Sequence, residues 1–233
     1  MMKNVLISGS SKGLGHMLTS ILRHEGYKVF SMGRTPADGV DLIVDLTDIE
    51  TTRVLLETFL SENNIDILIC NAGTGKMPFG VTSKKDLQDY FYSNNFLTAK
   101  NLINVCIPFL KPKSLVIAIS SIVALKDIEG APKEYASAKR ELNKMIRNLA
   151  VEQAPKEIRF NIISPGNIYF SGSRWEEISK EKPKFVQRML SDDVPLHNFI
   201  TPDEIAAAII YLSSENSRNI TGLNLVIDGG QSL

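Results

Sequence analysis

The sequence lacks an excess of charge of either sign. Among its 233 residues, 26 are basic and 26 are acidic, which gives a formal net charge of zero. Proteins that bind nucleic acid or anionic membrane surfaces usually carry clustered positive charge, so neither partner is expected. No apolar run approaches the ~20 residues that cross a bilayer. The N-terminus also lacks the long apolar region of a signal peptide, so we expect a cytoplasmic protein.

Cysteine is scarce as well, with two in the whole chain. Cys70 lies within the apolar run DILICNAG and Cys106 within NVCIPFL. Such surroundings favour packed thiols in a reducing compartment over a disulfide or a pair of metal ligands. No metal site is therefore expected.

The composition is that of a globular protein that buries a substantial core, with 43% hydrophobic and 22% charged residues. A chain of this length fits one large α/β domain better than two small ones. It contains no internal repeat, low-complexity tract or linker. We therefore expect a single domain over residues 1–233.

Short runs rich in Val and Ile alternate with amphipathic stretches. This alternation predicts a Rossmann-type, doubly wound parallel sheet of about seven strands with helices on both faces. The segment between the second and third runs is too short for a crossover helix, so a loop or one helical turn is expected there. The expected strands are 4–8, 28–33, 41–46, 66–73, 114–121, 159–166 and 224–230, and the expected helices are 15–26, 47–62, 84–110, 134–153 and 202–213.

Three glycines, Gly9, Gly13 and Gly15, separate the first strand from the first helix. A glycine-rich turn here brings backbone N–H groups and the positive end of the helix dipole up to a phosphate. A tight strand-to-helix turn alone would also explain the glycines. The context of strand, loop and amphipathic helix favours a dinucleotide site.

Tyr135 and Lys139 stand four residues apart within an expected helix, so their side chains share one face. Taken alone, such a pair is most often a solvated aromatic and a solvated cation. A free phenol, with a pKa of about 10, is poorly suited to proton transfer at neutral pH. A nearby ammonium, together with the positive charge of a bound cofactor, would favour the phenolate and lower that pKa.

Further motifs accompany the glycine loop and the tyrosine–lysine pair. In chain order they are Gly-x-x-x-Gly-x-Gly at 9–15, Asn71-Ala72-Gly73, Ser121, Tyr-x-x-x-Lys at 135–139, Pro165-Gly166 and the ending TGLNLVIDGG. In order and in spacing, over essentially the whole chain, these motifs resemble the classical short-chain dehydrogenase/reductase family. This resemblance implies an NAD(P)-dependent oxidoreductase that acts on a carbonyl/alcohol pair, and a homotetramer or homodimer assembled through the helices at 84–110 and 134–153.

The resemblance also implies four catalytic residues. Tyr135 would exchange the proton, Lys139 would tune the phenol and hold the nicotinamide ribose, and Ser121 would hydrogen-bond the substrate oxygen. Ser120 is the less favoured neighbour of Ser121. Asn95 would continue a proton relay to the lysine, with Asn94 as the alternative, although Thr98 stands where relatives have a smaller residue.

NADP(H) is favoured over NAD(H) as the cofactor. Gly33 stands where the carboxylate of an NAD-binding relative would fall, and Arg34 and Lys12 could bind a 2′-phosphate. Alternatively, Arg34 is a solvated residue that stacks on adenine. The expected cofactor-binding residues are Gly9, Ser11, Lys12, Gly13, Leu14, Gly15, Arg34, Asp45, Leu46, Asn71, Ala72, Gly73, Tyr135, Lys139, Pro165, Gly166 and Ile168.

The substrate is less well defined. Phe170 stands near the usual position of a threonine, for which Ser171 or Ser173 could substitute. Residues 169–194 correspond to the variable substrate lid of the family, with lysines expected on its solvated face. Tyr169, Phe170 and Trp175 are expected to wall the pocket and Arg174 to face an anionic group, which suits a sugar-derived or small cyclic ketone. The alternatives are a 3-ketoacyl-carrier-protein reductase and a non-catalytic NADP(H)-binding regulatory protein.

Overall fold

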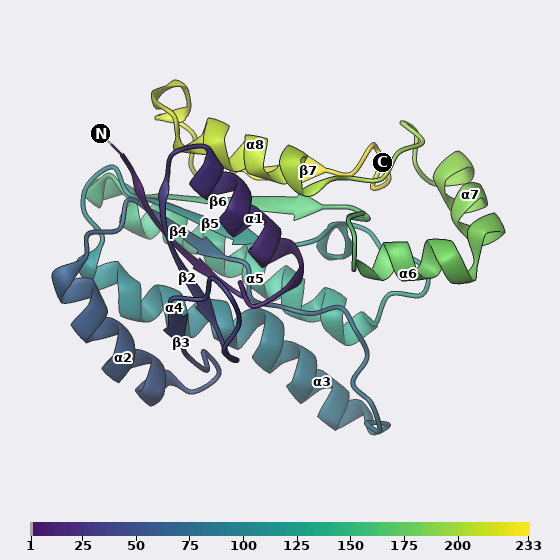
Figure 1. Ribbon diagram of the computed structural model, residues 1–233, viewed down its shortest axis with the longest axis horizontal. Helices are drawn as coiled ribbons and strands as arrows, with labels where there is room; N and C mark the ends of the chain where they lie inside the picture. The colour runs from purple at the N-terminus through teal and green to yellow at the C-terminus, as the bar shows by residue number, and fades with distance from the viewer. Residues whose placement is uncertain (1) are drawn as a thin grey trace.

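The computed structural model describes residues 2–233, and its centre is a seven-stranded sheet (Figure 1). The strand order is β3-β2-β1-β4-β5-β6-β7, and all neighbouring strands run parallel. This is the doubly wound α/β fold that the sequence predicts. The strands are β1 (Asn4–Ser8), β2 (Lys28–Gly33), β3 (Leu42–Ile43), β4 (Ile67–Cys70), β5 (Leu115–Ile119), β6 (Arg159–Pro165) and β7 (Asn224–Ile227).

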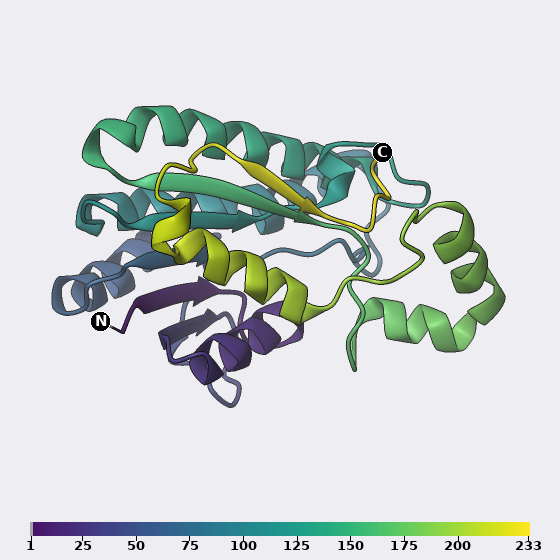
Figure 2. The same cartoon turned by 90° about the horizontal axis from the view of Figure 1, so that it is seen from above.

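Helices cover both faces of the sheet (Figures 1 and 2). One face packs against α1 and α8, and the other against α2, α4 and α5. The helices are α1 (Gly13–His24), α2 (Ile49–Glu62), α3 (Lys84–Tyr92), a π-helix (Ser93–Leu97), α4 (Thr98–Cys106), α5 (Lys133–Gln153), α6 (Arg174–Glu181), α7 (Pro183–Asp192) and α8 (Pro202–Ser213). Short 3₁₀ turns lie at Ile107–Phe109, Ile122–Ala124, Ala154–Lys156 and Glu215–Ser217.

The central strands are apolar at nearly every position because both of their faces are buried. In β1, Val5 and Ile7 belong to the core under α1 and α8, whereas Leu6 between them belongs to the core under α2, α4 and α5. Burial on both sides explains why these strands read as continuous hydrophobic runs. Cys70 and Cys106 are free and buried, as predicted.

Several elements are shorter or more divided than expected, and β4, β5 and β7 each end two or three residues before the ends of the predicted runs at 66–73, 114–121 and 224–230. The run at 41–46 forms only the two residues of β3, although Val44 and Leu46 beyond it are still buried. The helix expected at 84–110 is divided into α3, the π-helix and α4, followed by a 3₁₀ turn. The segment between β2 and β3 contains no helix, as its length predicts.

The topology brings several chain segments to one edge of the sheet. The chain leaves β1 toward β2 and β3 and then returns to place β4 on the other side of β1. In parallel sheets, ligands bind beyond the carboxyl ends of the strands where the order reverses in this way. At this edge the glycine loop follows β1, Asn71-Ala72-Gly73 follows β4 and Ser121 lies just beyond β5, while Pro165-Gly166 spans the end of β6.

The segment 169–194 contains α6 and α7, which project away from the sheet (Figure 2). The lysines at 180, 182 and 184 are exposed, as expected of a solvated helix face. Within residues 2–233, no helix has both the length and the apolar character needed to cross a membrane.

Candidate functional site

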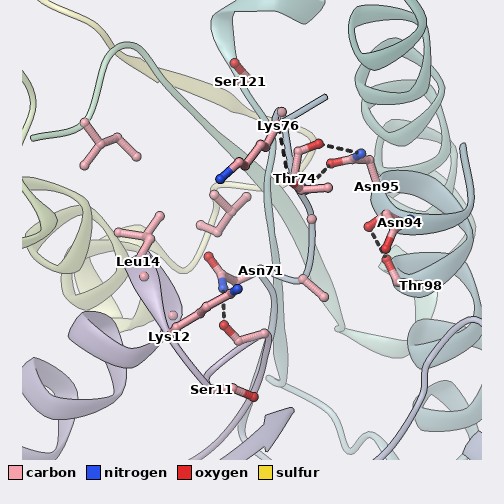
Figure 3. Close-up of a pocket in the computed structure, with 18 of the residues that line it drawn as sticks. Ser11, Lys12, Leu14, Asn71, Thr74, Lys76, Asn94, Asn95, Thr98 and Ser121 are labelled. Atoms are coloured by element: carbon pink, nitrogen blue, oxygen red, sulfur yellow. Dashed lines mark hydrogen bonds between the residues drawn. The ribbon is translucent and has the colours of Figure 1, made fainter. Parts of the chain in front are cut away.

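A cavity of about 690 Å³ opens at the carboxyl edge of the sheet. Its lining includes every residue that the sequence analysis predicts as catalytic or cofactor-binding, except Asp45. Figure 3 shows side chains from four separate segments pointing into this hollow, among them Lys12, Asn71, Lys76 and Ser121. One end is formed by the glycine loop and the residues after β2, and the other by Tyr135 and the start of α6.

Two constraints require glycine in the glycine loop, a positive φ angle at Gly9 and Gly13 and close packing at Gly9 and Gly15. Gly9 and Gly13 have positive φ angles of 74° and 64°, which favour glycine. A Cβ at Gly15 would lie 2.2 Å from the Gly9 oxygen and 2.4 Å from Nδ2 of Asn71. Asn71 in turn donates from Nδ2 to the Ser8 and Gly9 oxygens at 3.0 and 3.3 Å. The Asn71 side chain therefore ties β4 to the glycine loop.

The first turn of α1 faces the cavity without a side-chain cap from any described residue. Its N-cap residue, Lys12, has an extended backbone and lines the cavity. The free N–H groups and the helix dipole at such an end favour an anion. This end of the cavity is therefore suited to a phosphate group.

The end of β2 supplies a second cation and no carboxylate. Arg34 lines the cavity, and a Cβ at Gly33 would lie 1.9 Å from Oγ of Ser11. A side chain at position 33 would therefore collide with the glycine loop unless Ser11 moved. Asp45 lies outside the lining. Its carboxylate accepts from the Thr47 N–H and hydroxyl at 3.0 and 2.7 Å, so its role in cofactor binding stays a prediction.

Ser121, Tyr135 and Lys139 meet at the other end of the cavity. Ser121 begins the 3₁₀ turn after β5, and Tyr135 and Lys139 lie one turn apart in α5. Lys139 is 3% exposed, and its Nζ donates to the Ile119 oxygen at 2.9 Å. The same Nζ lies 6.0 Å from the centre of the Tyr135 ring. The predicted serine, phenol and ammonium are thus brought together.

Burial shifts the pKa values of both Tyr135 and Lys139. Burial raises the pKa of Tyr135, and the neighbouring Ser121 hydroxyl only partly opposes this. Burial also lowers the pKa of Lys139 to about 8. Burial dominates the pKa of Tyr135 in the protein without ligand, and the lowering expected from the ammonium together with a bound cofactor's charge stays a prediction. At neutral pH Tyr135 is a phenol and Lys139 remains mostly an ammonium.

Asn95 is fully buried in the π-helix. Its Oδ1 accepts from the Thr74 N–H at 2.9 Å, and its Nδ2 donates to the Thr74 and Phe91 oxygens, both at 3.0 Å (Figure 3). A Cβ at Gly73 would lie 2.7 Å from Oδ1 of Asn95 and 3.3 Å from Nζ of Lys139. Asn95 therefore fixes the loop after β4 beside the lysine.

Asn94, the alternative to Asn95, donates from Nδ2 to the Tyr90 oxygen at 2.8 Å within its own helical segment. The Thr98 hydroxyl donates to the Asn94 oxygen at 3.0 Å (Figure 3). Thr98 thus satisfies its hydroxyl against the preceding turn.

The predicted aromatic wall is only partly present. Phe170 lines the cavity, but Tyr169 and Trp175 do not. Instead, both rings pack on Phe199. The centroid of the Phe199 ring lies 5.3 Å from that of Tyr169 and 5.5 Å from that of Trp175. The reason is that the Tyr169 N–H bonds to the Ile200 oxygen at 2.8 Å, which sets Tyr169 beside Phe199.

Ser171 and Ser173, the two candidates to replace the threonine found in relatives, differ in their position relative to the cavity. Ser171 is exposed and outside the cavity lining. Ser173 lines the cavity, and its Oγ caps α6 by accepting from the Phe170 and Glu176 N–H groups at 3.2 and 3.1 Å. Arg174 lines the cavity as predicted and pairs with Glu177 at 3.0 Å.

Sequence reasoning missed the loop that directly follows Asn71-Ala72-Gly73. Thr74, Gly75 and Lys76 all line the cavity. A Cβ at Gly75 would lie 3.3 Å from Cε1 of Tyr135, so this loop packs against the phenol ring. Its position immediately after a predicted cofactor-binding motif was the available signal.

Comparisons with known proteins agree with this geometry. Residues 11–232 match the family described as Enoyl-(Acyl carrier protein) reductase. The chain is 29% identical to the protein FixR of Bradyrhizobium diazoefficiens, covering 99% of this chain and 87% of FixR. It is 25% identical to the 3-oxoacyl-[acyl-carrier-protein] reductase FabG of Thermotoga maritima, covering 98% and 97%. The structure of the Pseudomonas aeruginosa RhlG/NADP active-site complex superposes with a TM-score of 0.85 at 25% identity, covering 99% and 96%.

Proposed function

This chain belongs to the short-chain dehydrogenase/reductase family of oxidoreductases, and on that basis we propose that it transfers a hydride between NADP(H) and a small carbonyl/alcohol substrate. The observation that carries the proposal is the convergence of Ser121, Tyr135 and Lys139 at one end of a cavity whose other end is the glycine loop. Phosphate binding at one end and proton transfer at the other are the two requirements of this reaction.

The residues of the cavity fit a dinucleotide phosphate. The uncapped start of α1 and the crowded glycine loop offer backbone N–H groups at close range. Arg34 and Lys12 line the same end, and Gly33 supplies no carboxylate that would repel a 2′-phosphate. An arginine can bind phosphate through two parallel hydrogen bonds, which supports NADP(H) over NAD(H).

When bound, the nicotinamide would supply or accept the hydride, and side chains of the protein would donate or accept the proton. We assign to Ser121 a hydrogen bond to the carbonyl oxygen, which stabilises the negative charge that develops there. Tyr135, held as a phenol by burial, donates its proton to that oxygen during reduction. Lys139 stabilises the resulting phenolate electrostatically. Asn95 positions the loop that packs against Lys139 and the Tyr135 ring.

A second candidate function is reduction of a 3-oxoacyl group on an acyl carrier protein. It is favoured by the similarity to FabG along almost the full length of both chains. The same residues would carry the chemistry, and the substrate would reach them on a long pantetheine arm.

The cofactor proposal is tested by titrating the protein with NADPH and NADH and following nicotinamide fluorescence. We expect NADPH to bind more tightly. Arg34→Ala removes a charge-assisted hydrogen bond worth about 1.5–3 kcal/mol, so its Kd for NADPH should rise about 10- to 150-fold. Its Kd for NADH should stay nearly constant. Arg218→Ala, at an exposed arginine outside the cavity lining, is the matched control. Equal binding of both cofactors by the unmodified protein would contradict the proposal.

A further inference from the structure

The cavity carries a strong excess of positive charge, although the chain as a whole has none. Of the described residues that line it, Glu177 is the one acid. The cationic lining residues are Lys12, Arg34, Lys76, Lys139 and Arg174.

Four of these cations have an evident partner or role. Lys12 and Arg34 lie at the proposed phosphate end, and Lys139 lies beneath the phenol. Arg174 pairs with Glu177 at 3.0 Å. Lys76 remains, because none of the ion pairs within residues 2–233 includes it. Figure 3 shows its ammonium projecting into the hollow, away from the loop that carries it.

The backbone that carries Lys76 is held firmly beside the phenol. The Lys76 N–H donates to the Thr74 hydroxyl at 3.1 Å, and Thr74 is bonded through both its N–H and its oxygen to the Asn95 side chain. The intervening Gly75 packs on the Tyr135 ring. Lys76 is therefore anchored one residue from the contact with Tyr135, and its flexible side chain can reach a group bound next to the reacting oxygen.

We propose that Lys76 binds an anionic group, a carboxylate or a phosphate, that the carbonyl substrate carries close to its reacting carbon. This inference rests on the proposed oxidoreductase function and narrows its substrate class. An ammonium binds such a group as a compact point charge with three donors. Because Lys76 is exposed, a neutral ketone of the same size leaves its ammonium hydrated and gains no attraction from it, so the neutral ketone is the poorer substrate.

The test compares matched pairs of ketones that differ in charge. Acetoacetate is paired with methyl acetoacetate, and dihydroxyacetone phosphate with dihydroxyacetone, so that the carboxylate and phosphate sources are separated. We expect kcat/KM with NADPH to be at least tenfold higher for the anionic member of one pair. Lys76→Gln should abolish that preference by lowering kcat/KM for the anion alone, and Lys76→Arg should retain most of it.

Two controls separate an effect on substrate binding from an effect on surface charge or on cofactor binding. Lys84→Gln, at an exposed lysine outside the cavity lining, should change nothing. The Kd for NADPH should be the same in Lys76→Gln as in the unmodified protein. A weaker Kd would overturn the inference, because the lysine would then serve a phosphate of the dinucleotide.

Thermal shift of the NADPH-loaded protein with each ketone reports binding independently of turnover. A shift given by the anionic member and lost in Lys76→Gln supports the inference. Equal shifts and equal kcat/KM for the charged and neutral members would overturn it while leaving the proposed function intact. Turnover of none of the four ketones, with an anion-dependent shift still present, would count against the proposed function alone.

Discussion

Replacing Lys139 by Met should stabilise the ligand-free protein at neutral pH while removing a proposed catalytic group. Lys139 is 3% exposed, and burial lowers its pKa from an ordinary 10.5 to about 8. That difference corresponds to about 3 kcal/mol, since one pKa unit is about 1.4 kcal/mol. The substitution also removes the hydrogen bond to the Ile119 oxygen, which is worth about 1 kcal/mol. The expected net gain at pH 7 is about 2 kcal/mol.

The stability difference between Lys139→Met and the unmodified protein should decrease as the pH rises. Below pH 8 both the folded and unfolded chains carry the Lys139 ammonium, and the folded chain bears the full cost of burying it. Between pH 8 and 10.5 the unfolded chain binds more protons at this group, so stability rises with pH. The advantage of Lys139→Met should therefore shrink by about 2 kcal/mol between pH 7 and pH 9.5.

Denaturant unfolding of both proteins at the two pH values, without cofactor, measures this advantage. A gain of about 2 kcal/mol at pH 7 corresponds to a Tm about 4–8 °C higher for a chain of this size. Lys144→Met, at an exposed position of the same helix, should show no such pH-dependent difference. If Lys139→Met destabilised the protein at pH 7, or if its advantage were the same at both pH values, the argument from the buried ammonium would fail.

Two further substitutions test how the site is held together. Gly15→Ala places a Cβ 2.2 Å from the Gly9 oxygen and 2.4 Å from Nδ2 of Asn71. It should therefore lower the free energy of unfolding by about 1–3 kcal/mol and weaken NADPH binding. Unchanged denaturation and cofactor titration curves would show that the loop is looser than described. Asn95→Ala removes three hydrogen bonds, a buried one to Phe91 and two partly buried ones to Thr74. It should lower the free energy of unfolding by at least about 2 kcal/mol in chemical denaturation, with kcat falling more than KM rises. If Asn95→Ala kept full stability and full kcat, Asn95 would not be needed to position the loop after β4.

The fold and the members of the site could be predicted because the sequence marks them locally. Apolar runs mark strands that are buried on both faces, and a parallel sheet must bring the ends of β1, β4, β5 and β6 to one edge. Once this topology is assumed, the glycine loop, Ser121 and Tyr135 have to converge. The motifs, together with the family resemblance that they carry, therefore predicted the glycine loop, Ser121, Tyr135 and Lys139 as members of the cavity lining, although they missed the loop at 74–76.

Features that depend on long-range packing could not be predicted in this way. The direction of Trp175 is set by Phe199, which lies beyond α7 and has no periodic relation to it. The π-helix at Ser93–Leu97 follows no hydrophobic pattern. The pKa of Tyr135 depends on how completely neighbouring segments exclude water, which the spacing to Lys139 does not reveal. Lys76 went unnoticed because a lysine in a loop is ordinarily solvated.

The most direct test of the central claim is the rate at which NADPH reduces a responsive ketone in the Tyr135→Phe variant. Loss of the phenolic proton should lower kcat by about 10²- to 10⁴-fold, whereas the Kd for NADPH should rise by no more than about tenfold, which is the loss of one neutral hydrogen bond. Tyr92→Phe, at an exposed tyrosine outside the cavity lining, should keep full activity. Retention of normal turnover by Tyr135→Phe would contradict the proposed mechanism.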